Sequence, residues 1–89
     1  MILYEGDPAS ASEAVKKAVL QAQAQGRKAG VIDFNGDIDR AAREFFKELH
    51  RCDHEKVDVI YAAGLPEEGV GIAVMDRMRK AAGNNIIVL

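Results

Sequence analysis

The sequence predicts an α/β domain in which a four-stranded, mostly parallel sheet lies between layers of helix. Four short apolar runs alternate with three longer amphipathic segments along 89 residues, which gives the order βαβαβαβ. The apolar runs are nearly continuous, as in strands that are buried on both faces of a parallel sheet. The longer segments repeat apolar residues at helical spacing. Together these patterns predict a three-layer α/β/α domain with right-handed crossovers.

The first strand and first helix are expected at the start of the chain. Ile2 to Tyr4 form the first apolar run, and Gly6-Asp7-Pro8 ends it. Ser10 and Glu13 match the S-x-x-E capping box, which predicts a helix start at Ser10. Gly26 suits the left-handed position that stops a helix. The expected apolar face consists of Ala14, Val15, Ala18, Val19 and Ala22.

The second strand is expected from Ala29 to Phe34 and the second helix after it. Asn35-Gly36 is a typical turn, and Asp37 is a candidate N-cap. The helix that follows is predicted to bury the stripe Ile38, Ala41, Ala42, Phe45, Leu49 and Cys52.

The last part of the chain repeats this arrangement. A third strand is expected from Val57 to Ala62 and a third helix from about Val70 to Ala82. Gly83-Asn84-Asn85 then turns the chain into a fourth strand, Ile86 to Leu89.

Composition narrows the class of protein. With 89 residues, a net charge of −2 and 48% hydrophobic residues, residues 1–89 are expected to form one small globular domain. The scattered basic residues do not make the stripe that nucleic-acid binding requires, and no apolar run approaches the roughly 18 residues of a membrane span. The single Cys52 and the absence of a signal-like start favour a cytoplasmic protein.

The glycine-rich segment between the third strand and third helix has two interpretations. Gly64 and Gly69 have the spacing of a phosphate-binding P-loop, but Val70-Gly71 stands where that motif needs Lys and Ser or Thr. Gly69-Val-Gly71 also begins like a dinucleotide fingerprint, yet valine replaces its third glycine. Glu67 and Glu68 lie at the expected helix entrance, where they compensate the helix dipole and repel a phosphate. A tight turn is therefore the preferred interpretation, and Gly64, Glu67, Glu68, Gly69 and Gly71 remain the candidate ligand-binding residues.

Three other groups could carry chemistry. His50, Cys52 and His54 suggest a metal site, but helical residues two apart point in different directions, which favours a core cysteine and histidines at a helix end. The aspartates that follow the first two strands could form an acidic magnesium pocket, although helix capping explains them as well. Arg77, Arg79 and Lys80 occupy the end of the third helix, where they compensate its dipole. No catalytic residue and no metal ligand is assigned. The aspartates are Asp7, Asp33, Asp37 and Asp39.

Two stretches carry a resemblance to a known family. Ala42 to Asp53 resembles the pattern A-R-x-L-F-x-x-L-R-x-x-D. Val57 to Ile60 followed by Glu68 to Ala82 resembles D-x-I and then G-x-G-x-A-x-x-[ND]-R-[LM]-x-x-A-A. The family is the C-terminal, Rossmann-like accessory domain of two-domain threonylcarbamoyl-AMP synthases. His50 departs from the pattern, which often has arginine there.

The resemblance implies a function in tRNA modification. Members of the family make threonylcarbamoyl-adenylate from threonine, bicarbonate and ATP, for the threonylcarbamoyladenosine of tRNA. This chemistry, with its ATP and Mg, belongs to a catalytic domain of the YrdC type that this chain lacks. The resemblance thus implies an accessory domain that packs on a catalytic domain, in cis or in trans, and gates it, with no cofactor or catalytic residue of its own. The alternatives are a module that senses a nucleotide or metabolite at the carboxyl edge of the strands and a stand-alone enzyme.

Overall fold

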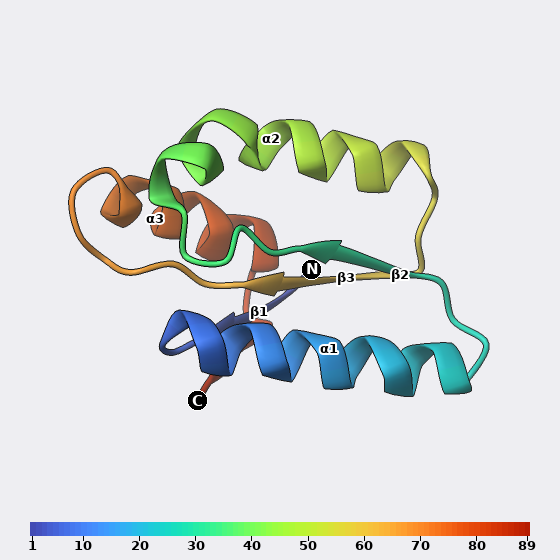
Figure 1. The fold of residues 1–89 in the computed structure, drawn as a ribbon. Coiled ribbons are helices and arrows are strands. Elements are labelled where there is room, and N and C mark those ends of the chain that lie inside the picture. The colour runs from blue at the N-terminus through green and yellow to red at the C-terminus, as the bar shows by residue number, and fades with distance from the viewer.

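The computed structural model describes residues 1–89 and confirms the predicted alternation of strands and helices (Figure 1). The four strands are all parallel and lie in the order β2-β3-β1-β4. The sheet is therefore a Rossmann-like parallel sheet, with β2 and β4 at its two edges. The elements are β1 (Ile2–Glu5), α1 (Pro8–Ala24), β2 (Ala29–Ile32), α2 (Ile38–His54), β3 (Val59–Ala63), α3 (Gly71–Ala82) and β4 (Ile86–Val88).

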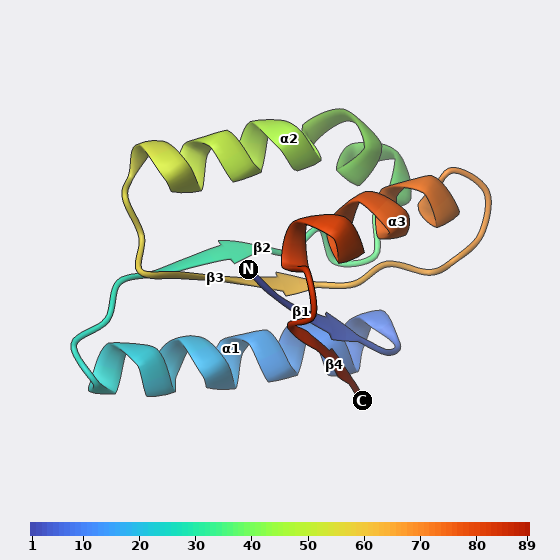
Figure 2. The same ribbon diagram turned by 180° about the vertical axis from the view of Figure 1, so that it is seen from behind.

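The helices form two unequal layers. α1 alone covers one face of the sheet, whereas α2 and α3 lie side by side on the other face (Figures 1 and 2). None of these helices is both long and apolar enough to cross a membrane. One face of the sheet is thus covered by a single helix.

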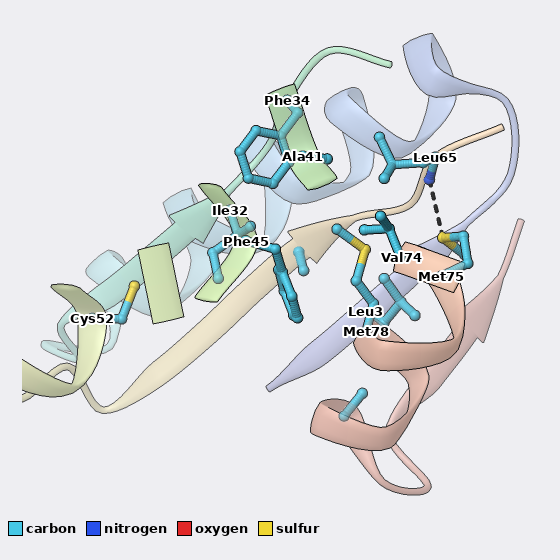
Figure 3. Packing of buried hydrophobic residues seen from close by; sticks show 12 residues of the cluster. Leu3, Ile32, Phe34, Ala41, Phe45, Cys52, Leu65, Val74, Met75 and Met78 are labelled. Carbon is cyan, nitrogen blue, oxygen red and sulfur yellow. Dashed lines mark hydrogen bonds between the residues drawn. The ribbon is translucent and has the colours of Figure 1, made fainter. Parts of the chain in front are cut away.

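Each face of the sheet has its own buried cluster. The larger cluster lies under α2 and α3 (Figure 3), and the smaller one lies between the sheet and α1. The close packing extends to Gly30 in β2, where a Cβ would lie 2.8 Å from the Cys52 Sγ of α2. The larger cluster includes Leu3, Ile32, Phe34, Phe45, Cys52, Leu65, Val74, Met75 and Met78.

The start of α1 differs from the sequence-based expectation. The helix begins at Pro8, and Asp7 is its N-cap, with its Oδ1 accepting from the amides of Ala9 (3.0 Å) and Ser10 (3.3 Å). The expected capping box at Ser10 and Glu13 is therefore wrong. Asp and Pro are favourable at the N-cap and first helical position, and this pair starts the helix earlier.

Three further expectations are corrected. β2 ends at Ile32 rather than at Phe34, although Phe34 is still buried as it leaves the sheet. Ala42 is exposed, so the buried stripe of α2 is narrower than predicted. The prediction that all strands are buried on both faces fails at β4, where Ile87 and Val88 are 43% and 77% exposed. Of the three residues of this edge strand, only Ile86 packs against the larger cluster, and Ile87 and Val88 are left in solvent.

Candidate functional site at the carboxyl edge of the sheet

The loops that follow β2 and β3 meet at the carboxyl edge of the sheet. Between them, at the starts of α2 and α3, lies a hollow of about 560 Å³. In open parallel sheets, this edge is the usual location of ligand sites. The hollow is lined by Gly36, Asp37, Ile38, Asp39, Glu68, Gly69 and Val70.

The glycines of the β3–α3 loop are required by its geometry. A Cβ on Gly71 would overlap the carbonyl oxygen of Pro66, and one on Gly64 would lie 3.0 Å from the carbonyl oxygen of Tyr4. Gly69 has φ of +54°, a left-handed conformation that other residues rarely adopt. The interpretation of this segment as a tight turn with close backbone approach is therefore confirmed.

The loop is also anchored to the core. The buried Leu65 donates its amide to the Met75 Sδ at 3.2 Å, and Gly64 donates to Tyr4 O at 2.8 Å. The amides of Gly71 and Ile72 donate to the loop carbonyls of Glu68 (2.9 Å) and Gly69 (3.3 Å). Two amides at the helix start thus already have partners within the loop.

Glu67 is held by an ion pair that the sequence did not reveal. Its carboxylate accepts from the Arg79 guanidinium, which also donates to Glu5 at the end of β1. These hydrogen bonds from Arg79 hold the pKa of Glu5 below its ordinary value, against the opposing effect of partial burial. Glu67 and Glu68 both precede α3, whose first turn itself contains no acidic residue. Arg79 lies in the last turn of α3, as expected for a residue that compensates the helix dipole, and it also joins three elements.

Capping explains two of the four aspartates that follow the first two strands. Asp37 Oδ1 accepts from Arg40 N at 3.0 Å, and Asp33 Oδ1 accepts from Asn35 N at 2.8 Å. The side chain of Asp7 accepts from the Ser10 hydroxyl as well as from amides, and these hydrogen bonds lower its pKa. The capping interpretation is therefore confirmed for Asp7 and Asp37, whereas Asp33 stabilises a turn inside the β2–α2 loop. Asp39 lies in the first turn of α2.

His50, Cys52 and His54 do not converge. Cys52 is fully buried beneath α2, whereas both histidines are exposed. Burial raises the pKa of the Cys52 thiol, which keeps it protonated. No three histidine, cysteine or carboxylate side chains of this chain are arranged to share a metal ion.

The structure divides the five candidate ligand-binding residues into two groups. Glu68 and Gly69 line the hollow, whereas Gly64 and Gly71 serve the packing of the loop and Glu67 pairs with Arg79. Sequence reasoning did not place Gly36 and Ile38 beside them. A signal for this existed, because the β2–α2 and β3–α3 loops both follow parallel strands and must therefore reach the same edge.

A second exposed feature lies on the outer side of α2 and α3. Phe46 is 53% exposed, and the Arg77 guanidinium lies 5.8 Å from the centre of its ring. Ala42 and Ala73 precede these two residues by one helical turn each and are also exposed. We call Ala42, Phe46, Ala73 and Arg77 the α2–α3 surface.

Comparison with known proteins gives a consistent result. The threonylcarbamoyl-AMP synthase of Pyrococcus abyssi is 36% identical over 98 residues, which cover 98% of this chain and 29% of that protein. The Bacillus subtilis threonylcarbamoyl-AMP synthase is 29% identical over 104 residues, again covering 98% of this chain and 29% of that protein. The chain therefore spans less than a third of the length of these relatives.

Solved structures agree with the sequence comparison. The crystal structure of P. abyssi Sua5 complexed with L-threonine matches with a TM-score of 0.88 and 36% identity, over 99% of this chain and 29% of that one. The C-terminal Sua5 domain from Pyrococcus horikoshii, crystallised by itself, matches with a TM-score of 0.77 and 30% identity, over 99% and 94% of the two chains. The family model of the threonylcarbamoyl-AMP synthase C-terminal domain matches residues 1–83. The chain thus belongs to the family of C-terminal domains of threonylcarbamoyl-AMP synthases.

Proposed function

We propose that the chain is a non-catalytic accessory domain that packs on the catalytic domain of a threonylcarbamoyl-AMP synthase and gates its active site. The catalytic domain would bind ATP and Mg and form threonylcarbamoyl-adenylate for the modification of tRNA. The accessory domain would act from outside, by favouring the closed arrangement of the segment that joins the two domains. A ligand or partner shifts such an equilibrium by as much as it discriminates between the two states.

The observation that carries this proposal is the α2–α3 surface. The stretches that resemble the family include Ala42, Phe46, Ala73 and Arg77, whose side chains are exposed. Core packing therefore does not explain these residue types. An exposed Phe beside an Arg, flanked by small residues, is the composition of an interface centre. A catalytic domain is the partner that the relatives suggest, because they contain this domain as 29% of a longer protein.

The arrangement of reactive side chains supports a non-catalytic role. The thiol of Cys52 is buried, and the exposed histidines on α2 are not hydrogen-bonded to a nucleophile. The strongest polar cluster, Arg79 with Glu5 and Glu67, is an ion pair that fastens α3 to the sheet and loop. We therefore expect the chain alone to release no pyrophosphate from ATP in the presence of threonine and bicarbonate.

A chimera tests the proposal. The chain would replace the C-terminal domain of the P. abyssi relative, and pyrophosphate release would be compared with that of the truncated catalytic part. We expect the chimera to differ from the truncated part in kcat or in KM for threonine. Phe46→Ala in the chimera should move these constants toward those of the truncated part. Leu20→Ala is the matched control, because Leu20 is also exposed (67%) but lies on α1, across the sheet.

The outcomes separate the two halves of the proposal. Identical kinetics of the chimera and the truncated part would contradict gating. If the chimera differs from the truncated part but Phe46→Ala and Leu20→Ala have equal effects, the result supports gating. The same result contradicts the α2–α3 surface as the contact with the catalytic domain. Turnover by the isolated chain would contradict the accessory role itself.

A second candidate function rests on the hollow at the carboxyl edge. Its volume of about 560 Å³ is sufficient for a small metabolite, and the loops around it connect to both α2 and α3. A ligand there would make the chain a sensing module. The carboxylates of Asp37, Asp39 and Glu68 at its wall favour a cationic or neutral ligand over a nucleotide phosphate.

A further inference from the structure

The two edges of the sheet are protected very differently. At the β2 edge, the Arg51 Nη2 of α2 donates to the Val31 carbonyl oxygen at 3.3 Å. This contact occupies an acceptor that a foreign strand would need and places a charge beside it. The β4 edge has no equivalent, because residues 84–89 contain neither a charged side chain nor a proline. Charges and prolines are the usual means by which proteins keep edge strands from pairing.

The backbone of β4 leaves four polar groups facing outward. Asn85 O accepts from Leu3 N at 2.9 Å, and Leu89 N donates to Glu5 O at 2.8 Å, so these residues direct their polar groups toward β1. Backbone groups of successive residues in a strand point to opposite sides. The N–H and C=O groups of Ile86 and Val88 therefore point away from the sheet at its open edge.

The outward-facing N–H and C=O groups of β4 are complementary to those of a second copy of β4. If a second β4 lies antiparallel with Ile87 opposite its own copy, Ile86 of each chain faces Val88 of the other. Both of these residues direct N–H and C=O outward, so the pair forms four hydrogen bonds around a two-fold axis. The central Ile87 pair is then of the closely spaced, non-hydrogen-bonded type, in which facing side chains are in contact.

The side chains suit the same arrangement. Ile87 is paired with Tyr4 and therefore lies on the α1 side of the sheet. Ile87 and Leu89 are 43% and 53% exposed. Because residues 84–89 carry no charged side chain, the side chains of two copies meet without charge repulsion, and each copy covers apolar surface of the other.

We propose that β4 is a self-association edge, through which two copies of this chain form an antiparallel, two-fold symmetric dimer with a continuous eight-stranded sheet. The order of strands is β2-β3-β1-β4 followed by the same four in reverse. The three-residue strand buries less than the roughly 1,200–2,000 Å² of a standard stable interface, so the dimer is weak and depends on concentration. Because both β4 edges are used, association ends at two copies.

Sedimentation equilibrium of the 89-residue chain tests this directly, since the corresponding P. horikoshii domain was crystallised by itself. Across micromolar to millimolar concentrations, we expect a monomer–dimer equilibrium. Ile87→Lys places two like charges opposite each other and should weaken association at least about tenfold. Val88→Pro removes an outward N–H without removing a hydrogen bond to β1, and it should also weaken association. Val31→Lys at the β2 edge, where Val31 is 38% exposed, is the control and should leave the dimer intact.

A disulfide test reports the geometry independently. Facing residues of a non-hydrogen-bonded antiparallel pair have Cα atoms about 4.5 Å apart, within the range that a disulfide spans. Under oxidising conditions, Ile87→Cys should therefore give covalent dimers much faster than Val31→Cys, whereas the buried Cys52 should not contribute.

Four results would overturn the proposal. The first is a chain that stays monomeric at millimolar concentration. The second is a dimer that survives both β4 variants while circular dichroism shows them folded. The third is association that continues beyond two copies. The last is equal rates of disulfide formation at Ile87→Cys and Val31→Cys.

Discussion

Arg79 near the end of α3 donates two hydrogen bonds to the carboxylate of Glu5 at the end of β1. The Nε–Oε2 distance is 3.0 Å and the Nη2–Oε1 distance is 2.8 Å. The same guanidinium pairs with Glu67 in the β3–α3 loop, so one side chain joins the first strand to a loop and a helix near the other end of the chain. The Glu5 side chain is 18% exposed, compared with 22–42% for the carboxylate partners in the ion pairs of α2.

Glu5→Gln should destabilise the domain by about 1–2 kcal/mol at pH 7, because it removes charge-assisted hydrogen bonds from a partly buried pair. Arg79 lowers the pKa of Glu5 in the folded state. A carboxylate with a lowered folded pKa contributes stability above its unfolded pKa and loses that contribution as pH falls through the folded pKa. The difference in the free energy of unfolding between Glu5→Gln and the parent should therefore become smaller as the pH is lowered. Urea unfolding at pH 7 and at pH 3 measures it.

Asp76→Asn is the matched control for Glu5→Gln. Asp76 pairs with Lys80 at 2.9 Å, but the two side chains are 61% and 77% exposed. Exposed pairs of this kind contribute about 0–1 kcal/mol. An equal loss of stability in both variants, or a Glu5→Gln effect that is unchanged at low pH, would contradict the role assigned to Arg79.

Phe45→Ala should reduce the free energy of unfolding by about 3–5 kcal/mol, a large share of what a small domain has. Phe45 is 2% exposed and lies in the larger cluster between α2 and the sheet (Figure 3). The neighbouring Phe46 is 53% exposed, so Phe46→Ala makes the same chemical change outside the core. Chemical denaturation of both variants measures the contrast. A loss below about 1 kcal/mol for Phe45→Ala would be inconsistent with its central position.

Gly71→Ala should destabilise the domain, although glycine-to-alanine changes inside helices usually stabilise by about 1 kcal/mol. Gly71 is the first residue of α3, and a Cβ there would meet the carbonyl oxygen of Pro66 and lie 3.2 Å from Ile38 Cδ1. Gly71→Val should be worse because it adds further atoms in the same place. Thermal unfolding without any ligand shows whether Gly71→Ala stabilises or destabilises the domain. A higher Tm for Gly71→Ala would show that the loop can move aside.

The order of elements could be predicted because it depends on local patterns. Apolar runs, the Asp37 cap and the left-handed Gly26 are properties of neighbouring residues, and the structure agrees with each. The start of α1 was wrong because two capping signals lie three residues apart, and Asp7-Pro8 prevails over Ser10. Choosing between them requires the position of the helix against the sheet, which a local pattern does not contain.

The candidate site was less predictable because its contacts join distant parts of the chain. Glu5 and Arg79 are 74 residues apart, and the partners of Arg79 follow from the strand order β3-β1-β4, which sequence reasoning could not deduce. The glycine spacing correctly indicated a turn, since motif residues for phosphate were absent. That Glu68 lies beside Asp37 and Asp39 depends on α2 and α3 sharing one face of the sheet.

The last prediction concerns the glycine loop and nucleotides. We expect ATP with magnesium to bind at about millimolar affinity or more weakly, roughly −4 kcal/mol, because Asp37, Asp39 and Glu68 line the hollow and no lysine does. Glu68→Gln is the sharper variant, since Glu67 is already held by Arg79 and its loss would also disturb the fold. Removing the Glu68 charge should leave stability nearly unchanged and ATP binding weak. Titration monitored at the backbone amides of Gly69–Ile72 provides the measurement. Saturable shifts at micromolar ATP would make this turn a nucleotide site and would favour the sensing function over the accessory one.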